Sequence, residues 1–255
     1  PILGATVAAR GSTSGDMGVY VAGVRVSSWS AVGYSLVTVS NAHAVWLDAS
    51  TMTAVSYSTA VTDNAGFAAV YFNSSDRNTV TDSYIQNLPG DGARLTGGSD
   101  FNAISRSVLY SAAAGFSALA VVGSSTNTIL DSFISGSTAV VVSGSTGTVI
   151  GGSVLIATNT TGSALSLAAG SVNLTLTTSA FTAGPSGAGI VLQPGNSGLI
   201  ALTSNTILGG RWGVSIATMN CGGTCTGNIS ISSMIITGPL TAGATGIHFA
   251  GGAFI

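Results

Sequence analysis

Residues 78–85 read NTVTDSYI, and the same pattern returns as NAISRSVL at 102–109, NTILDSFI at 127–134 and GTVIGGSV at 147–154. Weaker copies are VNLTLTTSAF at 172–181 and GNISISSMII at 227–236. The third residue of the pattern recurs at intervals of 24, 25, 20 and 25 residues, at Val80, Ile104, Ile129, Val149 and Leu174. A near-constant period of this length is typical of solenoids, in which each repeat is one coil stacked on its neighbours.

A second repeated unit occupies the other half of each period. It is a short apolar run, such as AVWL at 44–47, AVYF at 69–72 and AVVV at 139–142. Its last apolar residue recurs in step with the first series, at Leu47, Phe72, Leu95, Val121, Val142, Leu167, Leu192 and Ile216.

The chemistry of these runs favours strands. They are short, rich in Val, Ile and Thr, and separated by the turn formers Gly, Ser and Asn. Val80 and Ile85 are five residues apart, which fits neither a strand nor a helix period, so we expect a bend near Asp82–Ser83. Each coil then holds about three strands, and strands one period apart pair in parallel, about 4.8 Å from each other. The sequence predicts an all-β parallel β-helix of about ten coils.

The Asn-x-Val/Ile-x-x-Ser-x-Ile units at 78–85, 102–109 and 127–134 resemble the repeats of right-handed parallel β-helix proteins, the pectate-lyase-like superfamily. The resemblance covers roughly residues 18–249 and implies a right-handed β-solenoid. Lyases, hydrolases, adhesins, phage tailspikes and structural rods share this fold, so the resemblance does not imply one activity.

The same resemblance implies a ladder of stacked side-chain amides at one turn of successive coils. Asn78, Asn102 and Asn127 match that pattern, and Gly147 ends it.

The composition excludes several classes of protein. Charged residues make up 5% of the chain, against a usual roughly 25%, and the sequence has no Lys and no Glu. Six Arg and eight Asp without a basic run cannot displace counterions from phosphates, so we expect no nucleic-acid partner. Ser, Thr or Gly interrupts every apolar run before the roughly 18 residues that a membrane-spanning helix needs. With 45% hydrophobic residues, the chain can bury enough apolar surface to fold.

Superposing the repeats places Asp82, Arg106 and Asp131 at one position on three consecutive coils, and Asp76 over Asp100. An Arg between two carboxylates has good hydrogen-bond geometry, so we interpret the column as a structural charge ladder that helps to fix the register of the coils. The alternative is a polysaccharide site, in which Asp pairs act as acid and base, or hold Ca²⁺ while Arg takes the proton.

Two departures from the family weigh against that polysaccharide site. The Asn-Thr-Asp, Asp-Asp and Gly-His-Gly elements of polygalacturonase-like enzymes are absent, since Gly246-Ile247-His248 is not the last of them. Calcium sites of pectate-lyase-like enzymes gather three or more acidic residues around one groove, whereas Arg106 interrupts the acidic column. We therefore expect no catalytic residue, no metal and no cofactor.

The histidines and tryptophans are expected to have structural roles. His43 in NAHAVW and His248 in GIHF lie within or beside apolar runs, and no Ser or Asp pattern indicates a catalytic triad. Trp29, Trp46 and Trp212 could stack on sugars, but they are spread along the chain, which favours packing in the core or at the edges of coils.

Both cysteines lie in CGGTC, where the loop between Cys221 and Cys225 can close into a disulfide. Free thiols are an alternative, and a metal site would need two further ligands that the nearby sequence lacks. A disulfide implies an oxidising compartment, so we predict an extracellular or cell-surface location. Without an initiator Met or a leader, Pro1 is expected to begin a processed mature chain or a fragment of a longer one.

The ends of the expected rod are apolar. Residues 1–9 (PILGATVAA) and 246–255 (GIHFAGGAFI) are compatible with strands, and the net charge is only -2. Open coils expose unpaired strand edges, so we expect the ends to meet other subunits. We divide the chain into an apolar segment at 1–17, a candidate inter-subunit strand, and one β-helix domain at 18–255.

The sequence thus predicts a secreted, non-enzymatic structural subunit that stacks head to tail on copies of itself into a filament, fibre or surface layer. The alternative is a polysaccharide lyase or hydrolase, or a glycan-binding adhesin, on the same fold. In that case its partners are glycans, including those of cell surfaces.

Overall fold

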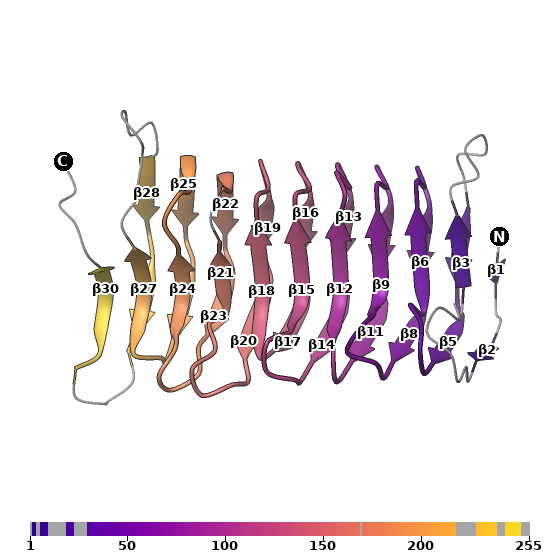
Figure 1. Ribbon diagram of the computed structural model, residues 1–255. Coiled ribbons are helices and arrows are strands. Elements are labelled where there is room, and N and C mark those ends of the chain that lie inside the picture. The colour runs from indigo at the N-terminus through magenta and orange to yellow at the C-terminus, as the bar shows by residue number, and fades with distance from the viewer. Residues whose placement is uncertain are drawn as a thin grey trace.

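The repeated runs form strands, three to a coil, and the coils stack into a rod (Figure 1). The computed structural model describes residues 2–3, 6–9, 19–22, 30–168, 170–217, 228–238 and 243–250. For the first three ranges, and for Asn228 and Ala250, only the backbone is described. Cys221, Cys225 and Trp29 lie outside the described residues.

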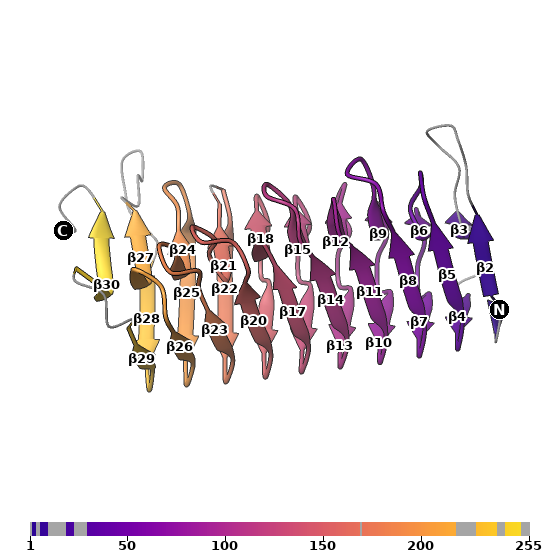
Figure 2. The same cartoon turned by 90° about the horizontal axis from the view of Figure 1, so that it is seen from below.

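Three parallel sheets run along the rod, and in the described part of the chain each contains ten strands, one from each coil (Figure 2). Sheet A contains β1 (Ile2–Leu3), β4 (Ala31–Gly33), β7 (Ala54–Ser56), β10 (Thr79–Thr81), β13 (Ala103–Ser105), β16 (Thr128–Leu130), β19 (Val149–Gly151), β22 (Val172–Thr177), β25 (Ser197–Thr203) and β28 (Asn228–Ser232). Sheet B contains β2 (Thr6–Ala9), β5 (Leu36–Val39), β8 (Thr59–Thr62), β11 (Tyr84–Asn87), β14 (Val108–Ser111), β17 (Phe133–Gly136), β20 (Val154–Ala157), β23 (Ala180–Thr182), β26 (Thr206–Leu208) and β29 (Ile235–Thr237). Sheet C contains β3 (Val19–Ala22), β6 (Val45–Asp48), β9 (Ala68–Asn73), β12 (Asp91–Thr96), β15 (Ser117–Val122), β18 (Thr138–Ser143), β21 (Leu165–Leu167), β24 (Ala188–Leu192), β27 (Trp212–Ala217) and β30 (Thr245–Ala250).

This arrangement confirms the expected fold class, a parallel β-helix of three short strands per coil. The described residues contain no helix that is long and apolar enough to cross a membrane. The strands β1 and β2 pair with β4 and β5 of the second coil. The boundary expected after residue 17 therefore falls within the first coil, and contact of this segment with another subunit stays a prediction.

Aliphatic ladders fill the inside of the rod. The series from Leu47 to Ile216 is confirmed, because its members pair from strand to strand along sheet C and each is buried. Val80, Ile104 and Ile129 pair in the same way along sheet A. Each such ladder buries apolar area against the coils above and below, which is the main stabilising contribution to a solenoid.

Two members of the sheet A series were assigned one or two residues too early. Ile129 pairs with Ile150, and Ile150 pairs with Leu176. Ile150 and Leu176 therefore occupy the ladder positions that we expected for Val149 and Leu174. Val149 is only half-buried, because it lies on the opposite face of its strand. The coil that leads to Val149 is shorter than its neighbours. The repeat at 147–154 was therefore aligned with the repeat at 127–134 one residue too early.

The same shift changes the end of the asparagine column. Gly147, with a φ of 69°, occupies the same place in its coil as Thr126, with a φ of 56°, occupies in the coil before. Thr148, not Gly147, therefore follows Asn127 in the column, and its Oγ1 is buried without a hydrogen-bond partner among the described residues.

The predicted bend is present between sheets A and B. Asp82 has a φ of 50° and lies between the end of β10 and the start of β11. Its N–H donates to the carbonyl oxygen of Ser105 in the next coil, so the turn remains part of the hydrogen-bond ladder. Positive φ recurs at this corner in coil after coil, at Tyr34, Tyr57, Arg106, Asp131, Gly152, Thr178, Ser204 and Ser233.

Buried polar side chains connect the coils at two corners. The Oδ1 atom of Asn102 accepts hydrogen bonds from the N–H of Asn78 at 2.9 Å and from its Nδ2 at 3.1 Å. The Nδ2 atom of Asn102 donates to the carbonyl oxygen of Ser75 at 2.7 Å, and Asn127 Oδ1 accepts from the Asn102 N–H. Two serine ladders follow the same rule, in which the N–H of one serine donates to the hydroxyl of the serine one coil on. One ladder runs from Ser35 through Ser58, Ser83, Ser107, Ser132 and Ser153 to Ser179, and the other runs from Ser50 through Ser75, Ser99 and Ser124 to Ser145.

Candidate functional site

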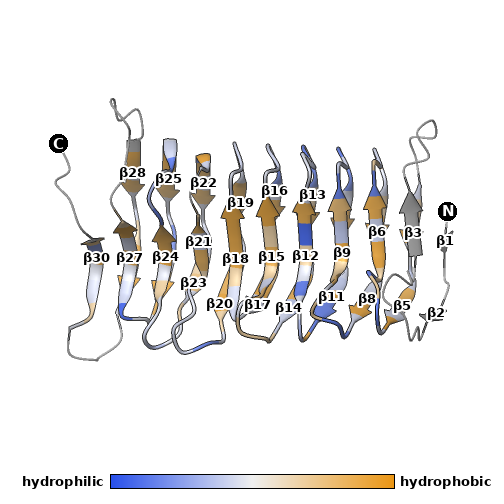
Figure 3. Cartoon of the chain, in the orientation of Figure 1, coloured by the Kyte–Doolittle hydropathy of each residue, from blue (hydrophilic) through white to orange (hydrophobic). Residues whose placement is uncertain are grey.

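Large polar and aromatic side chains gather on the outer face of sheet C over three neighbouring coils. Trp46 on β6 pairs with Tyr71 on β9, and Tyr71 pairs with Arg94 on β12. Along the next coils this column continues with the smaller Ala120, Val141 and Ser166. Figure 3 shows the contrast, because β12 has strongly hydrophilic segments between more hydrophobic neighbours.

His43 joins the aromatic part of this column from the loop that precedes β6. Its imidazole stacks on the Tyr71 ring, with centroids 4.3 Å apart and planes 11° apart. It contacts Trp46 edge-on at 5.4 Å and Phe67 edge-on at 5.1 Å. The stack fixes the Tyr71 ring in one orientation, and the Thr96 hydroxyl donates a hydrogen bond to Tyr71 Oη at 3.0 Å.

A buried carboxylate holds the arginine. Asp91 Oδ2 lies 3.2 Å from Arg94 Nη1, and Asp91 Oδ1 accepts hydrogen bonds from the N–H and hydroxyl of Ser117 in the next coil. The Asp91 side chain is 8% exposed, whereas that of Arg94 is 45% exposed. No described residue accepts a hydrogen bond from Arg94 Nε or Nη2. These two groups can therefore donate to a ligand.

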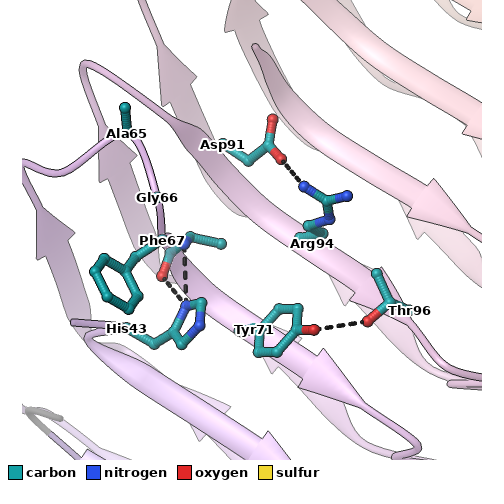
Figure 4. Close-up of a pocket in the computed structure, with 9 residues that line it drawn as sticks. His43, Ala65, Gly66, Phe67, Tyr71, Asp91, Arg94 and Thr96 are labelled. Atoms are coloured by element: carbon teal, nitrogen blue, oxygen red, sulfur yellow. Dashed lines mark hydrogen bonds and ion pairs between the residues drawn. The ribbon is translucent and has the colours of Figure 1, made fainter. Parts of the chain in front are cut away.

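These side chains border a hollow of about 240 Å³ at the corner between sheets B and C. The loop of Ala65, Gly66 and Phe67 lies on one side, and Asp91 and Arg94 lie on the other (Figure 4). The complete lining is His43, Ala65, Gly66, Phe67, Ala68, Tyr71, Asp91, Arg94 and Thr96. An aromatic wall with a few convergent polar groups is typical of sites for small ligands and sugars.

Burial lowers the pKa of His43 below its ordinary value, and the positive charge of Arg94 lowers it further, against a hydrogen bond with Ala68 that raises it. The imidazole is therefore neutral at pH 7. Its Nδ1 atom lies 3.0 Å from both the nitrogen and the carbonyl oxygen of Ala68. If Nδ1 carries the proton and donates to that oxygen, Nε2 has a free lone pair and can act as a base; the other tautomer makes Nε2 a donor.

The charged column expected from the repeats lies elsewhere, at the corner between sheets A and B. Arg106 Nε and Nη2 donate to the two carboxylate oxygens of Asp82 at 2.9 and 2.8 Å. This pairing lowers the pKa of Asp82 and raises that of Arg106. Asp131 occupies the next position but forms no ion pair with Arg106, so among the described residues the ladder is one pair rather than a fork. Two exposed tyrosines, Tyr34 and Tyr57, stack at 4.9 Å in the same column.

Asp76 and Asp100 lie at the corner between sheets C and A. Asp76 Oδ1 accepts a hydrogen bond from the Asp100 N–H at 2.9 Å, and Asp100 Oδ1 accepts from the N–H of Ser125. Their carboxylates thus join successive coils, and the sheet A strands β10 and β13 separate them from Asp82 and Arg106. The two columns of charged residues expected from the repeats therefore lie at two different corners, and the alternative polysaccharide site that would use both is divided between them. No cluster of three or more His, Cys, Asp or Glu side chains suited to a metal occurs in the described part of the chain.

The other histidine and the other described tryptophan that the sequence analysis singled out, His248 and Trp212, are near the other end of sheet C. Trp212 stacks on His248 at 4.6 Å, and the Arg211 guanidinium lies 4.9 Å from the Trp212 ring centre. Both histidines therefore contact aromatic rings on the outer face, rather than the aliphatic core.

Sequence reasoning missed Tyr71, Asp91 and Arg94 as site residues. A signal for the column was present, because Leu47, Phe72 and Leu95 form an inward series and neighbouring residues of a strand point to opposite faces. One step back along each strand gives the outward Trp46, Tyr71 and Arg94. The approach of His43 and Asp91 to this column depends on the loops at the sheet B–sheet C corner, which vary in length from coil to coil.

The fold and the hollow define the class of this protein as a right-handed parallel β-helix with an aromatic and charged site on one sheet. Residues 68–232 match the family described as "Right handed beta helix region", and the chain belongs to this family. No curated protein matches the sequence.

Several solved structures are similar. The surface adhesin PfbA of Streptococcus pneumoniae has a TM-score of 0.57 and 12% identity, over 82% of this chain and 62% of the adhesin chain. The chain thus spans less than two thirds of that adhesin. An alginate lyase from Paenibacillus sp. str. FPU-7 has a TM-score of 0.59 and 11% identity, over 97% of this chain and 98% of the lyase. The tailspike protein of E. coli bacteriophage HK620, solved in complex with a pentasaccharide, has a TM-score of 0.50 and 13% identity, over 82% of this chain and 44% of the tailspike. At these identities the similarity shows the fold alone.

Proposed function

We propose that the chain binds a carboxylate-bearing polysaccharide, without cleaving it, in the hollow on sheet C. The observation that carries the proposal is the position of Arg94, half-exposed beside the fixed ring of Tyr71. An aromatic ring offers an apolar face to a sugar, and a guanidinium with free N–H groups pairs with a uronate carboxylate. Glycan ligands or substrates among the similar proteins support the same class of partner.

This proposal follows the glycan-binding alternative of the sequence analysis. The head-to-tail filament expected there stays an untested prediction, and the similar structures support the glycan-binding alternative better. A glycan partner also fits the predicted extracellular or cell-surface location.

The experiment is titration calorimetry with alginate oligosaccharides and with neutral dextran oligosaccharides as the comparison. We expect the chain to bind alginate in preference to dextran, Tyr71→Ala to lower the affinity at least about tenfold, and Arg94→Gln to remove the preference for the acidic sugar. Val141→Ala is the matched control, because it lies on the same face outside the hollow. Equal binding by the Tyr71→Ala variant would show that the hollow is not the site.

A lyase is the second candidate function, and the neutral His43 close to Arg94 is the observation that favours it. A neutral imidazole can take the proton beside a uronate carboxylate whose charge an arginine compensates. Incubation with alginate and measurement of the unsaturated product by ultraviolet absorbance separates the two functions. Product formation that His43→Gln abolishes would establish a lyase, and binding without product would establish a binding protein.

A further inference from the structure

The outer face of sheet B carries no charged side chain between β5 and β29. Two side chains point outward on each of these nine strands, and none of them is Asp or Arg. Only Ser135 among them is buried. The most exposed apolar members, with exposures between 36% and 62%, are Leu36, Tyr84, Val108, Phe133, Val154, Leu208 and Ile235. The other apolar members, Val61, Tyr110, Ile156 and Ala180, are half-buried. A continuous apolar strip of this kind marks an interaction surface.

Charged residues border this strip on one side. Asp82, Arg106 and Asp131 occupy the adjoining corner on consecutive coils. Arg106 is 58% exposed, and Asp131 has no ion pair among the described residues. An apolar centre with a charged edge has the composition of a protein–protein interface. Two other partners fit the strip less well than a protein does. A sugar-binding site would need convergent polar groups and a site for an anionic membrane would need basic groups, and the strip has neither.

We propose that two copies of the chain associate through the outer faces of sheet B, with their rods antiparallel and related by a two-fold axis. An axis that lies in the interface, perpendicular to the rods, brings the same corner of both copies to the same side. The charges select the register, because Arg106 then lies beside Asp131 of the second copy and the symmetry repeats this pair. The association does not depend on the glycan site, which is on sheet C.

The same register places large side chains opposite small ones. Phe133 faces Val108 of the second copy, since these two residues are neighbours across β14 and β17. By the same geometry Tyr84 faces Val154 of the second copy. These two residues are three coils apart in one chain, whereas Phe133 and Val108 are one coil apart. On the second outward row, Tyr110 faces Ser135, the buried and smallest member of that row. Such alternation allows two sheet faces to interdigitate.

The size of the strip sets the strength of association. In this register the eight strands from β5 to β26 face one another, and at about 4.8 Å spacing they give a length of about 34 Å. Two outward side chains on each strand give a width of about 12 Å. The two copies together would bury about 800 Å², somewhat below the lower limit of about 1,000 Å² for specific interfaces. We therefore expect a reversible dimer that dissociates on dilution.

The test is sedimentation equilibrium of the whole chain over a range of concentrations at low and high salt. We expect a monomer–dimer equilibrium, and Phe133→Asp should weaken it at least about tenfold because it buries an unpaired charge. Leu199→Asp is the matched control, since Leu199 is an apolar residue with 50% exposure on sheet A. Circular dichroism establishes that both variants fold.

A second variant tests the register. Asp131→Arg places like charges together in the dimer and leaves the Asp82–Arg106 pair intact, so it should weaken association, most strongly at low salt. Asp131→Asn should weaken it less. A monomer at every concentration would overturn the proposal, and so would a dimer that Phe133→Asp does not weaken.

Discussion

Replacement of Asn102 by Ala should destabilise the middle of the rod strongly. The side chain is buried and forms hydrogen bonds with the corner of the preceding coil, accepting from the Asn78 N–H and donating to the Ser75 carbonyl oxygen. Removal leaves both groups without this partner inside the protein. A buried polar group that loses its partner costs about 1–3 kcal/mol, so the free energy of unfolding should fall by roughly 2–5 kcal/mol.

The assay is chemical denaturation followed by circular dichroism, with hydrogen exchange of the backbone amides at residues 76–105. Asn73→Ala is the matched control, because Asn73 is only half-buried and its Nδ2 donates to the Asp48 carboxylate. We expect the control to cost below about 1 kcal/mol. Equal losses for Asn102→Ala and Asn73→Ala, with no faster exchange at 76–105, would refute the role of the amide column in joining the coils.

Three further results follow from the side-chain contacts. Asp91→Ala should lower the free energy of unfolding by about 1–3 kcal/mol, because the Ser117 N–H loses its acceptor, and should weaken alginate binding in calorimetry because Arg94 loses its anchor. Because the pKa of His43 is lowered in the folded state, the protein loses stability as the pH falls from about 6.5 through the folded pKa of His43. Thermal melts from pH 8 to 4.5 should show this decrease in melting temperature, and the His43→Phe variant should lack it. Asp82→Asn should leave the melting temperature unchanged within error, since water screens its ion pair with Arg106, and a clear decrease would contradict this view.

The fold could be predicted from the sequence because a solenoid repeats its chemistry. Leu47, Phe72 and Leu95 occur at the same phase of each period, and every coil adds the same evidence for the same strand. The sequence alignment slipped at Val149, where the coil is shorter and Gly147, two residues before the strand, adopts the positive φ of the corner. Periodicity locates a coil, whereas the register within it also depends on which residue adopts the positive φ at the corner.

The candidate site depends on what does not repeat. Asp91 and Arg94 are both charged residues on one strand, but their association with His43 results from the loops between sheets B and C, which follow no period. The charged column was easier to read because Asp82, Arg106 and Asp131 are at equivalent positions. Equivalent positions show that the three side chains lie on neighbouring coils, but they do not show which of them form ion pairs. Among these residues Arg106 forms an ion pair with Asp82 alone.

The most direct test of the proposed function is hydrogen exchange of the whole chain with and without alginate oligosaccharides. Glycan binding in the hollow predicts slower exchange at residues 65–71 and 91–96, and no change at the sheet A–sheet B corner around Asp82 and Arg106. Slower exchange at that corner instead, or no change anywhere at saturating oligosaccharide, would contradict it.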